Sequence, residues 1–198
     1  MRVAAVILAA GASRRYGEDK LLVELDGKPL LQHAVDAANA SGVDDVIVVL
    51  GHDSDAVLAS VRLGRARAVT NPDHGAGQST SLRLGIRAAS GADAAVVLLG
   101  DQPRVTAHLI DALIARARET RSAAVVSSLD GRRSPPTLLR RELWPALEGI
   151  SGDVGAREIL AGRGDVAVLD VTDDLGTLDD VDRPSDLARI AKAGKIQL

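Results

Sequence analysis

Residues 3–20 read V-A-A-V-I-L-A-A-G-A-S-R-R-Y-G-E-D-K, and the two parts of this stretch differ sharply in character. Positions 3–10 are all apolar, which is typical of a strand buried on both faces in a parallel sheet. From Gly11 to Lys20 the chain is small, basic and polar. Because open α/β sheets bind ligands beyond the carboxyl ends of their strands, this loop is predicted to bind a polyanion.

Apolar runs of similar length recur and predict the rest of a sheet. Strands are expected at 46–50, 67–70, 94–99, 123–127 and 166–170, with 137–140 as a further candidate. Helices are expected at 29–40, 53–60, 79–89, 107–118, 142–147 and 151–160, and from 184 onward. This alternation predicts a three-layer α/β/α sandwich around a mostly parallel sheet.

We expect a single domain over residues 1–198, a usual length for one hydrophobic core. Residues 130–136 contain two prolines and are predicted to form a polar loop. The surrounding region, about 128–165, is the least regular part of the pattern. It is therefore expected to be an insertion over one edge of the sheet, as a lid or an oligomer contact.

Composition excludes several classes of function. The chain has 24 Lys and Arg against 27 Asp and Glu, a net charge of −3, so we expect no nucleic-acid partner. It has no cysteine, which excludes disulfides, thiolate metal sites and cysteine nucleophiles. No apolar run approaches the ~20 residues of a membrane span, and no signal peptide is recognisable. The expected location is the cytoplasm, without a membrane partner.

The loop after the first strand has the chemistry of a triphosphate site. Glycine backbone N–H groups, Arg15 and Lys20 can bind phosphate oxygens. The spacing matches neither G-x-x-x-x-G-K-[ST] nor G-x-G-x-x-G, so a standard P-loop and a dinucleotide Rossmann domain are both excluded. The alternative interpretation of this loop is an ordinary solvated turn.

Carboxylates follow two later strands. Asp101 comes directly after the run 94–99, and Asp180 and Asp182 lie between the last strand and the last helix. Carboxylates at this edge of the sheet can hold Mg²⁺ and bridge it to phosphates. Asp101 can equally be a plain turn residue, and the second acidic pair favours the metal interpretation.

The glycine-rich loop 71–81 is the third candidate. Its glycines would let a nucleobase approach the backbone, and its Ser, Gln and Asn side chains can hydrogen-bond a base edge. Ser79 is alternatively the cap of the following helix. His74 is the one histidine in this loop, and the four histidines show no metal spacing.

These segments together resemble a known family. The first motif, 7–20, resembles the L-A-A-G-x-x-x-R-M-G-x-x-K signature of nucleotidyltransferases. Four further segments occur in the order seen in molybdenum cofactor cytidylyltransferases and MobA-like proteins: N-P…G-Q-S-T-S-L at 71–82, L-G-D-Q-P at 99–103, S-G-D-V-G-A-R at 151–157 and D-V-D-R-P-S-D-L at 180–187. The resemblance covers nearly the whole chain.

The resemblance implies a role for each matching position. Arg15 and Lys20 would hold the triphosphate and, with Asp101, would be catalytic. Asp101 and Asp182, with Asp180 as helper, would bind Mg²⁺. The nucleotide would also meet Ala9, Ala10, Gly11, Gly77, Ser79 and Ser81. Asp153 and Arg157 would lie on the acceptor side, with 128–165 as an acceptor-side insertion.

The implied reaction is transfer of CMP from CTP to the phosphate of molybdopterin or its molybdenum form, with release of pyrophosphate. CTP is implied over GTP because L-A-A-G and D-Q-P are the cytidylyl forms. Ser134-Pro135-Pro136 departs from the family's usual Gly-His-Pro or Gly-Asn-Pro, which leaves the acceptor open. A sugar phosphate acceptor and a non-catalytic cofactor carrier remain alternatives, and a molybdoenzyme or its chaperone is the expected protein partner.

Overall fold

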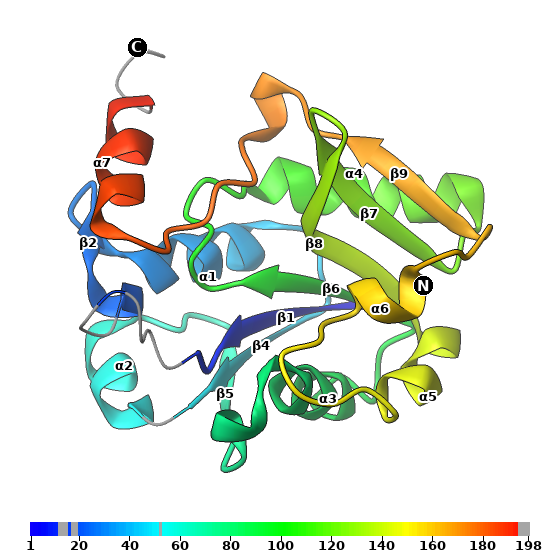
Figure 1. Ribbon diagram of the computed structural model, residues 1–198, viewed down its shortest axis with the longest axis horizontal. Coiled ribbons are helices and arrows are strands. Elements are labelled where there is room, and N and C mark those ends of the chain that lie inside the picture. Colours follow the sequence, from blue (N-terminus) through cyan, green and yellow to red (C-terminus); the bar gives the residue numbers. More distant parts are fainter. Residues whose placement is uncertain (12–15, 17–19, 52, 194–198) are drawn as a thin grey trace.

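A seven-stranded sheet forms the centre of the protein (Figure 1). The computed structural model describes residues 1–11, 16, 20–51 and 53–193. The strand order is β5-β4-β1-β6-β8-β7-β9. The strands are β1 Val3–Ala9, β4 Asp45–Leu50, β5 Arg67–Thr70, β6 Ala94–Leu99, β7 Ala124–Leu129, β8 Arg132–Arg140 and β9 Val166–Asp170.

The first strand is the central member of the parallel part of the sheet. It pairs in parallel with β4 and β6, so that Ile7 lies opposite Val48 on one side and Leu98 on the other. All seven residues of β1 are buried, as the unbroken apolar run predicts. This pairing places the carboxyl ends of β1 and β6 next to each other.

Helices cover both faces of the sheet (Figure 1). Odd-numbered residues of β1 face a core shared with α1 Leu30–Ala40, α2 Ser54–Ser60 and α4 Ala107–Thr120. Even-numbered residues face α3 Gln78–Ala88, α5 Trp144–Leu147 and α6 Arg157–Leu160. Thr106 caps α4 by accepting the Leu109 N–H at 3.1 Å. The predicted three-layer α/β/α sandwich is therefore confirmed.

The C-terminal helix α7, Pro184–Ala193, forms a smaller apolar cluster away from the main sheet. It packs beside a two-stranded hairpin of β2 Glu24–Leu25 and β3 Lys28–Pro29. Buried Leu25, Leu30, Val181 and Ile190 form this cluster, and Tyr16 of the first loop packs against it. Through this cluster, α7 connects Tyr16 of the first loop with the segment around Val181, which directly precedes the helix.

The predicted polar loop at 130–136 is wrong, because β8 begins at Arg132 and lies within the sheet between β6 and β7. The strand is antiparallel to both neighbours and follows a tight turn in which Asp130 and Gly131 have positive φ. Proline cannot donate to a sheet ladder, but the ladder is already interrupted by a register shift at 126/127, opposite the two prolines. The segment is therefore part of the sheet rather than a cover over its edge.

Two helix predictions also need correction. Only Arg157–Leu160 is helical in the predicted helix 151–160, and the preceding residues cross the start of α3. The helix α3 begins at Gln78 with Gly77 as its cap residue, so Ser79 is not the cap. Among the described residues, no helix combines the length and the apolar composition that crossing a membrane requires.

Gly85 allows α3 to approach the sheet closely. A methyl group at this position would overlap Cγ1 of Val6 and lie 3.0 Å from Cγ2 of Val49, both in the core. Alanine gains about 1 kcal/mol in helix propensity over glycine, whereas overpacking a core costs about 1–3 kcal/mol. Steric overlap with two strands should exceed the propensity gain.

We therefore expect Gly85→Ala to lower the free energy of unfolding by about 1–2 kcal/mol, as measured by urea denaturation. Gly91→Ala is the control, because a Cβ there meets nothing within 4 Å. A stabilised Gly85→Ala variant would show that α3 does not depend on this close approach.

Candidate active site

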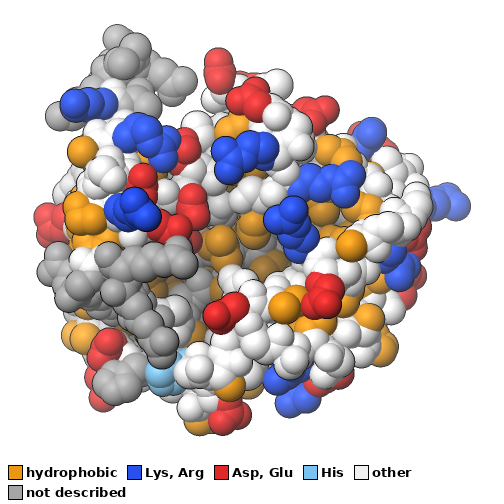
Figure 2. Space-filling model, in the orientation of Figure 1, with side chains coloured by type: hydrophobic (Ala, Val, Ile, Leu, Met, Phe, Trp, Pro, Cys, Tyr) orange, Lys and Arg blue, Asp and Glu red, His pale blue; other side chains and the backbone are white. Residues whose placement is uncertain are grey.

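A cleft of about 540 Å³ opens at the carboxyl ends of β1 and β6. Figure 2 shows it as a hollow with apolar side chains on its floor and acidic side chains along one side. Most of the predicted site residues line it: Ala9, Ala10, Gly11, Lys20, Gly77, Ser81, Asp101, Asp153 and Asp182. The structure thus brings together segments that are up to about 170 residues apart in the chain.

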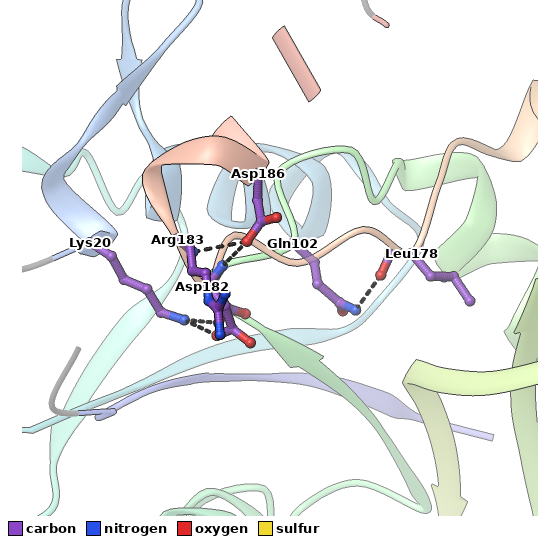
Figure 3. A network of polar contacts seen from close by, with 7 residues as sticks. Lys20, Gln102, Leu178, Asp182, Arg183 and Asp186 are labelled. Carbon is purple, nitrogen blue, oxygen red and sulfur yellow. Dashed lines mark hydrogen bonds and ion pairs between the residues drawn. The ribbon is translucent and has the colours of Figure 1, made fainter. Parts of the chain in front are cut away.

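Lys20 lies between two carboxylates at one side of this cleft. Its Nζ is 2.6 Å from Oδ2 of Asp101 and 3.1 Å from Oδ1 of Asp182 (Figure 3). The Lys20 and Asp101 side chains are 14% and 17% exposed, whereas that of Asp182 is 46% exposed. This ammonium neutralises part of a locally negative site.

The charges of this group shift two pKa values. Partial burial disfavours the Lys20 ammonium, but the Asp101 and Asp182 carboxylates outweigh burial and raise the pKa of Lys20 above 10.5. The Asp180 carboxyl loses part of its hydration and faces the charges of Asp182 and Asp101, so its pKa is also raised. Asp180 is thus electrostatically coupled to the pair, although it does not line the cleft.

The loop 71–81 forms another wall of the cleft and is held by Asn71. The buried Asn71 amide donates to Oγ1 of Thr80 at 2.8 Å and to Oγ of Ser81 at 2.9 Å. The Asn71 amide group therefore stabilises the conformation of the loop. Ser81, Gly77 and Gln78 reach the cleft, whereas the fully buried Ser79 does not.

The predicted acceptor segment crosses the start of α3. Gly152 accepts the Ser79 N–H at 3.1 Å, and Arg83 donates to the carbonyl of Ile150. A side chain at Gly77, where φ is +105°, would overlap the Gly152 backbone. Asp153 lines the cleft at this crossing, whereas Arg157, the first residue of α6, does not.

Sequence reasoning missed part of the cleft. Tyr16 also lines it, and no role was predicted for this side chain. Its position within the first motif, 7–20, is the signal that could have identified it. His74 and Gln78 line the cleft as well, and both belong to the glycine-rich loop predicted to meet the base. Arg15, the predicted triphosphate arginine, lies outside the described residues.

The acidic residues are suited to a divalent cation. Oδ1 of Asp101 is buried and has no hydrogen-bond partner within the described parts of the chain, so it retains capacity to bind a ligand. No group of three or more acidic, histidine or cysteine side chains suitable for a metal occurs among those same residues. Mg²⁺ and Mn²⁺ accept one or two carboxylates, with phosphates and water completing the shell. Asp101 and Asp182 fit that pattern.

Comparison with known proteins agrees with this geometry. The family model of the MobA-like NTP transferase domain matches residues 5–168, which include most of β1, the glycine-rich loop and Asp101. The chain belongs to this family. Its members are nucleotidyltransferases, so the MobA-like resemblance of the sequence motifs is confirmed.

Relatives of this MobA-like protein carry diverse names. Purine catabolism protein PucB of Bacillus subtilis is 35% identical over 203 residues, covering 95% of each chain. Nicotine blue oxidoreductase of Paenarthrobacter nicotinovorans is 34% identical over 195 residues, covering 95% of this chain and 96% of the relative. The solved structure of Rv0371c from Mycobacterium tuberculosis in complex with manganese is 26% identical, with a TM-score of 0.82 over 98% of this chain and all of that one.

Lys20→Met should bind Mn²⁺ more tightly than the wild type when no nucleotide is present. The substitution removes the cation that shares Asp101 and Asp182 and makes the site more negative by one charge. Free Mn²⁺ can be measured from its electron paramagnetic resonance signal during a protein titration.

The matched control is Lys28→Met, which removes a surface lysine paired with Asp36. Its Mn²⁺ affinity should equal that of the wild type. Unchanged or weaker Mn²⁺ binding by Lys20→Met would contradict the assignment of these two carboxylates to a cation site.

Proposed function

We propose that this protein transfers CMP from CTP to the phosphate of a molybdopterin-type acceptor in a Mg²⁺-dependent reaction that releases pyrophosphate. Membership of a nucleotidyltransferase family supplies the reaction class. The preference for CTP rests on the L-A-A-G and D-Q-P forms of the two motifs. The acceptor rests on the resemblance of residues 151–157 to the molybdopterin branch.

One observation carries the proposal. The cleft places the backbone of Ala9 to Gly11 and the loop at Gly77 and Ser81 around the same space as Lys20 and the carboxylates of Asp101 and Asp182. Glycines and small residues suit a nucleoside, and a lysine beside two carboxylates suits a metal-bound triphosphate. These groups match the two ends of one nucleoside triphosphate.

The chain's own residues would act by positioning and charge. The backbone of the first loop and Ser81 orient the nucleoside, and Lys20 turns from the carboxylates toward the phosphates. Asp101 and Asp182 would hold Mg²⁺, which when bound neutralises phosphate charge as the α-phosphorus is attacked. The acceptor phosphate is already an anion at neutral pH, so it needs no strong general base.

The acceptor would enter past Asp153. This residue lines the cleft on a segment tied to the start of α3, beside the glycine-rich loop. Arg157 lies exposed beyond the cleft lining, where it could attract an anionic acceptor during approach.

The name of one relative favours a second candidate, an oxidation or reduction of an organic molecule. The chain lacks the G-x-G-x-x-G fingerprint of dinucleotide binding. NADPH binding with no CTP binding would support this candidate over nucleotidyl transfer.

The direct test measures pyrophosphate from each of the four nucleoside triphosphates with Mg²⁺ and molybdopterin. We expect release with CTP and molybdopterin, and none when a sugar phosphate replaces molybdopterin. Release with the sugar phosphate alone would contradict the acceptor assignment. Tight molybdopterin binding without pyrophosphate release would identify a carrier.

Asp101→Asn should reduce pyrophosphate release by about 100-fold or more, because the amide cannot supply a negative metal ligand. The control is Asp165→Asn, which alters an exposed carboxylate paired with Arg163. Near-normal turnover by Asp101→Asn would contradict the proposed metal site.

A further inference from the structure

The segment that carries the second carboxylate is attached to the loop that carries the first. Residues 176–182, here called the acidic strap, run beside the loop 100–105. The N–H of Val181 donates to the Asp101 carbonyl at 3.0 Å, and the N–H of Thr177 donates to the Arg104 carbonyl at 3.3 Å. An antiparallel bridge joins Val105 and Gly176. The placement of Asp182 relative to Asp101 therefore depends on how the strap lies.

Gln102 fastens this strap from within the protein. Gln102 is 1% exposed, and its Nε2 donates to the Leu178 carbonyl at 3.0 Å (Figure 3). The same Nε2 also donates to Oγ of Ser134 at 3.2 Å. Gln102 directly follows Asp101 in the chain and bonds the middle of the strap. One buried amide thus ties the two carboxylate-bearing segments together and also contacts β8.

The far end of the strap is held by α7. Oδ2 of Asp186 accepts the N–H of Arg183 at 2.9 Å and that of Asp182 at 3.2 Å (Figure 3). Val181 is fully buried in the cluster with Leu25 and Ile190. Asp186 therefore holds the backbone of Asp182 at the α7 end of the strap. Gln102 holds the strap at Leu178, four residues earlier in the chain.

We propose that Gln102 is a positioning residue that sets the placement of Asp182 against Asp101 and thereby the affinity of the site for a divalent cation. This inference rests on the proposed function, in which the two carboxylates bind that cation. Gln102 does not line the cleft, so it acts through the strap and not by contact with substrate. Loss of its donor would leave the buried Leu178 carbonyl without this bond.

The test is Mn²⁺ binding by Gln102→Met, followed by electron paramagnetic resonance with no nucleotide or acceptor present. Methionine keeps the approximate length of the side chain and removes both donated hydrogen bonds. Outer partners of metal ligands typically contribute 10–100-fold to metal affinity, so we expect Mn²⁺ binding to weaken by about 10-fold. The concentration of Mg²⁺ that half-saturates turnover should rise in parallel.

Two controls separate positioning from general destabilisation. Gln32→Met removes another buried amide, which donates to the Arg62 carbonyl at 3.0 Å and to Oδ1 of Asp36 at 2.8 Å, neither of which belongs to the strap. It should lower thermal stability and leave Mn²⁺ affinity unchanged. Ser134→Ala removes the other acceptor of Gln102 and keeps the bond to Leu178. It should also leave Mn²⁺ affinity unchanged.

The outcomes are distinguishable. Wild-type Mn²⁺ affinity in Gln102→Met, or the same loss in Gln32→Met or Ser134→Ala, would overturn the positioning role. If Gln102→Met does not fold, Asp186→Ala tests the same strap from its other end and should weaken Mn²⁺ binding. If the wild type and Asp101→Asn bind Mn²⁺ equally, it is the proposed metal site that fails.

Discussion

The candidate site depends on one ammonium group placed between two carboxylates. Asp101 and Asp182 come from segments about 80 residues apart, and like charges so close together would repel each other without a cation between them. The ammonium group of Lys20 is that cation when no ligand is bound. The arrangement means that the protein holds these two carboxylates together through one of its own side chains.

The parallel pairing of β1 with β6 is what makes this contact possible. The register that sets Leu8 beside Leu99 brings the first loop and Asp101 to the same edge of the sheet. The third partner, Asp182, reaches that edge because α7 packs beside the β2–β3 hairpin and delivers the strap that precedes it. The two carboxylates and the first loop are therefore positioned by different layers of the fold, which meet at one edge of the sheet.

The sequence predicted the parts of the fold that follow from local pattern. Apolar runs identified β1, β4, β6 and β9. The positions of Lys20, Asp101 and Asp182 after strands of one sheet, together with the family resemblance, predicted that these residues share one site, and they lie in contact. The second half of β8 was predicted as a candidate strand at 137–140, but its first half, 132–136, was predicted as a loop. Proline normally argues against a strand, and the register shift that accommodates it is a property of the pair of strands. Residues 151–156 were predicted to be helical because Ser151 and Asp153 resemble a helix cap. A cap signature does not show that the Gly152 carbonyl instead accepts the Ser79 N–H from a distant segment.

The role of Gln102 could not be predicted for a similar reason. In the sequence it is a polar residue after an aspartate and before a proline, which describes many surface turns. Its significance arises only when burial places its amide against the Leu178 carbonyl. The role of a residue such as Gln102 depends on contacts between distant segments, whereas the positions of strands and loops follow from the local pattern of apolar and polar residues.

The crossing of Gly77 and Gly152 has a consequence for exchanging parts between proteins of this fold. The two backbones meet there with no room for a side chain at Gly77, so the glycine-rich loop and the segment 150–156 are packed as one unit. A new acceptor segment grafted at 150–156 would have to reproduce that narrow passage as well as new contacts to its ligand. If the proposed roles of the two segments hold, a chimaera that changed the segment 150–156 alone would also shift the glycine-rich loop, and the preferences for nucleotide and acceptor would change together.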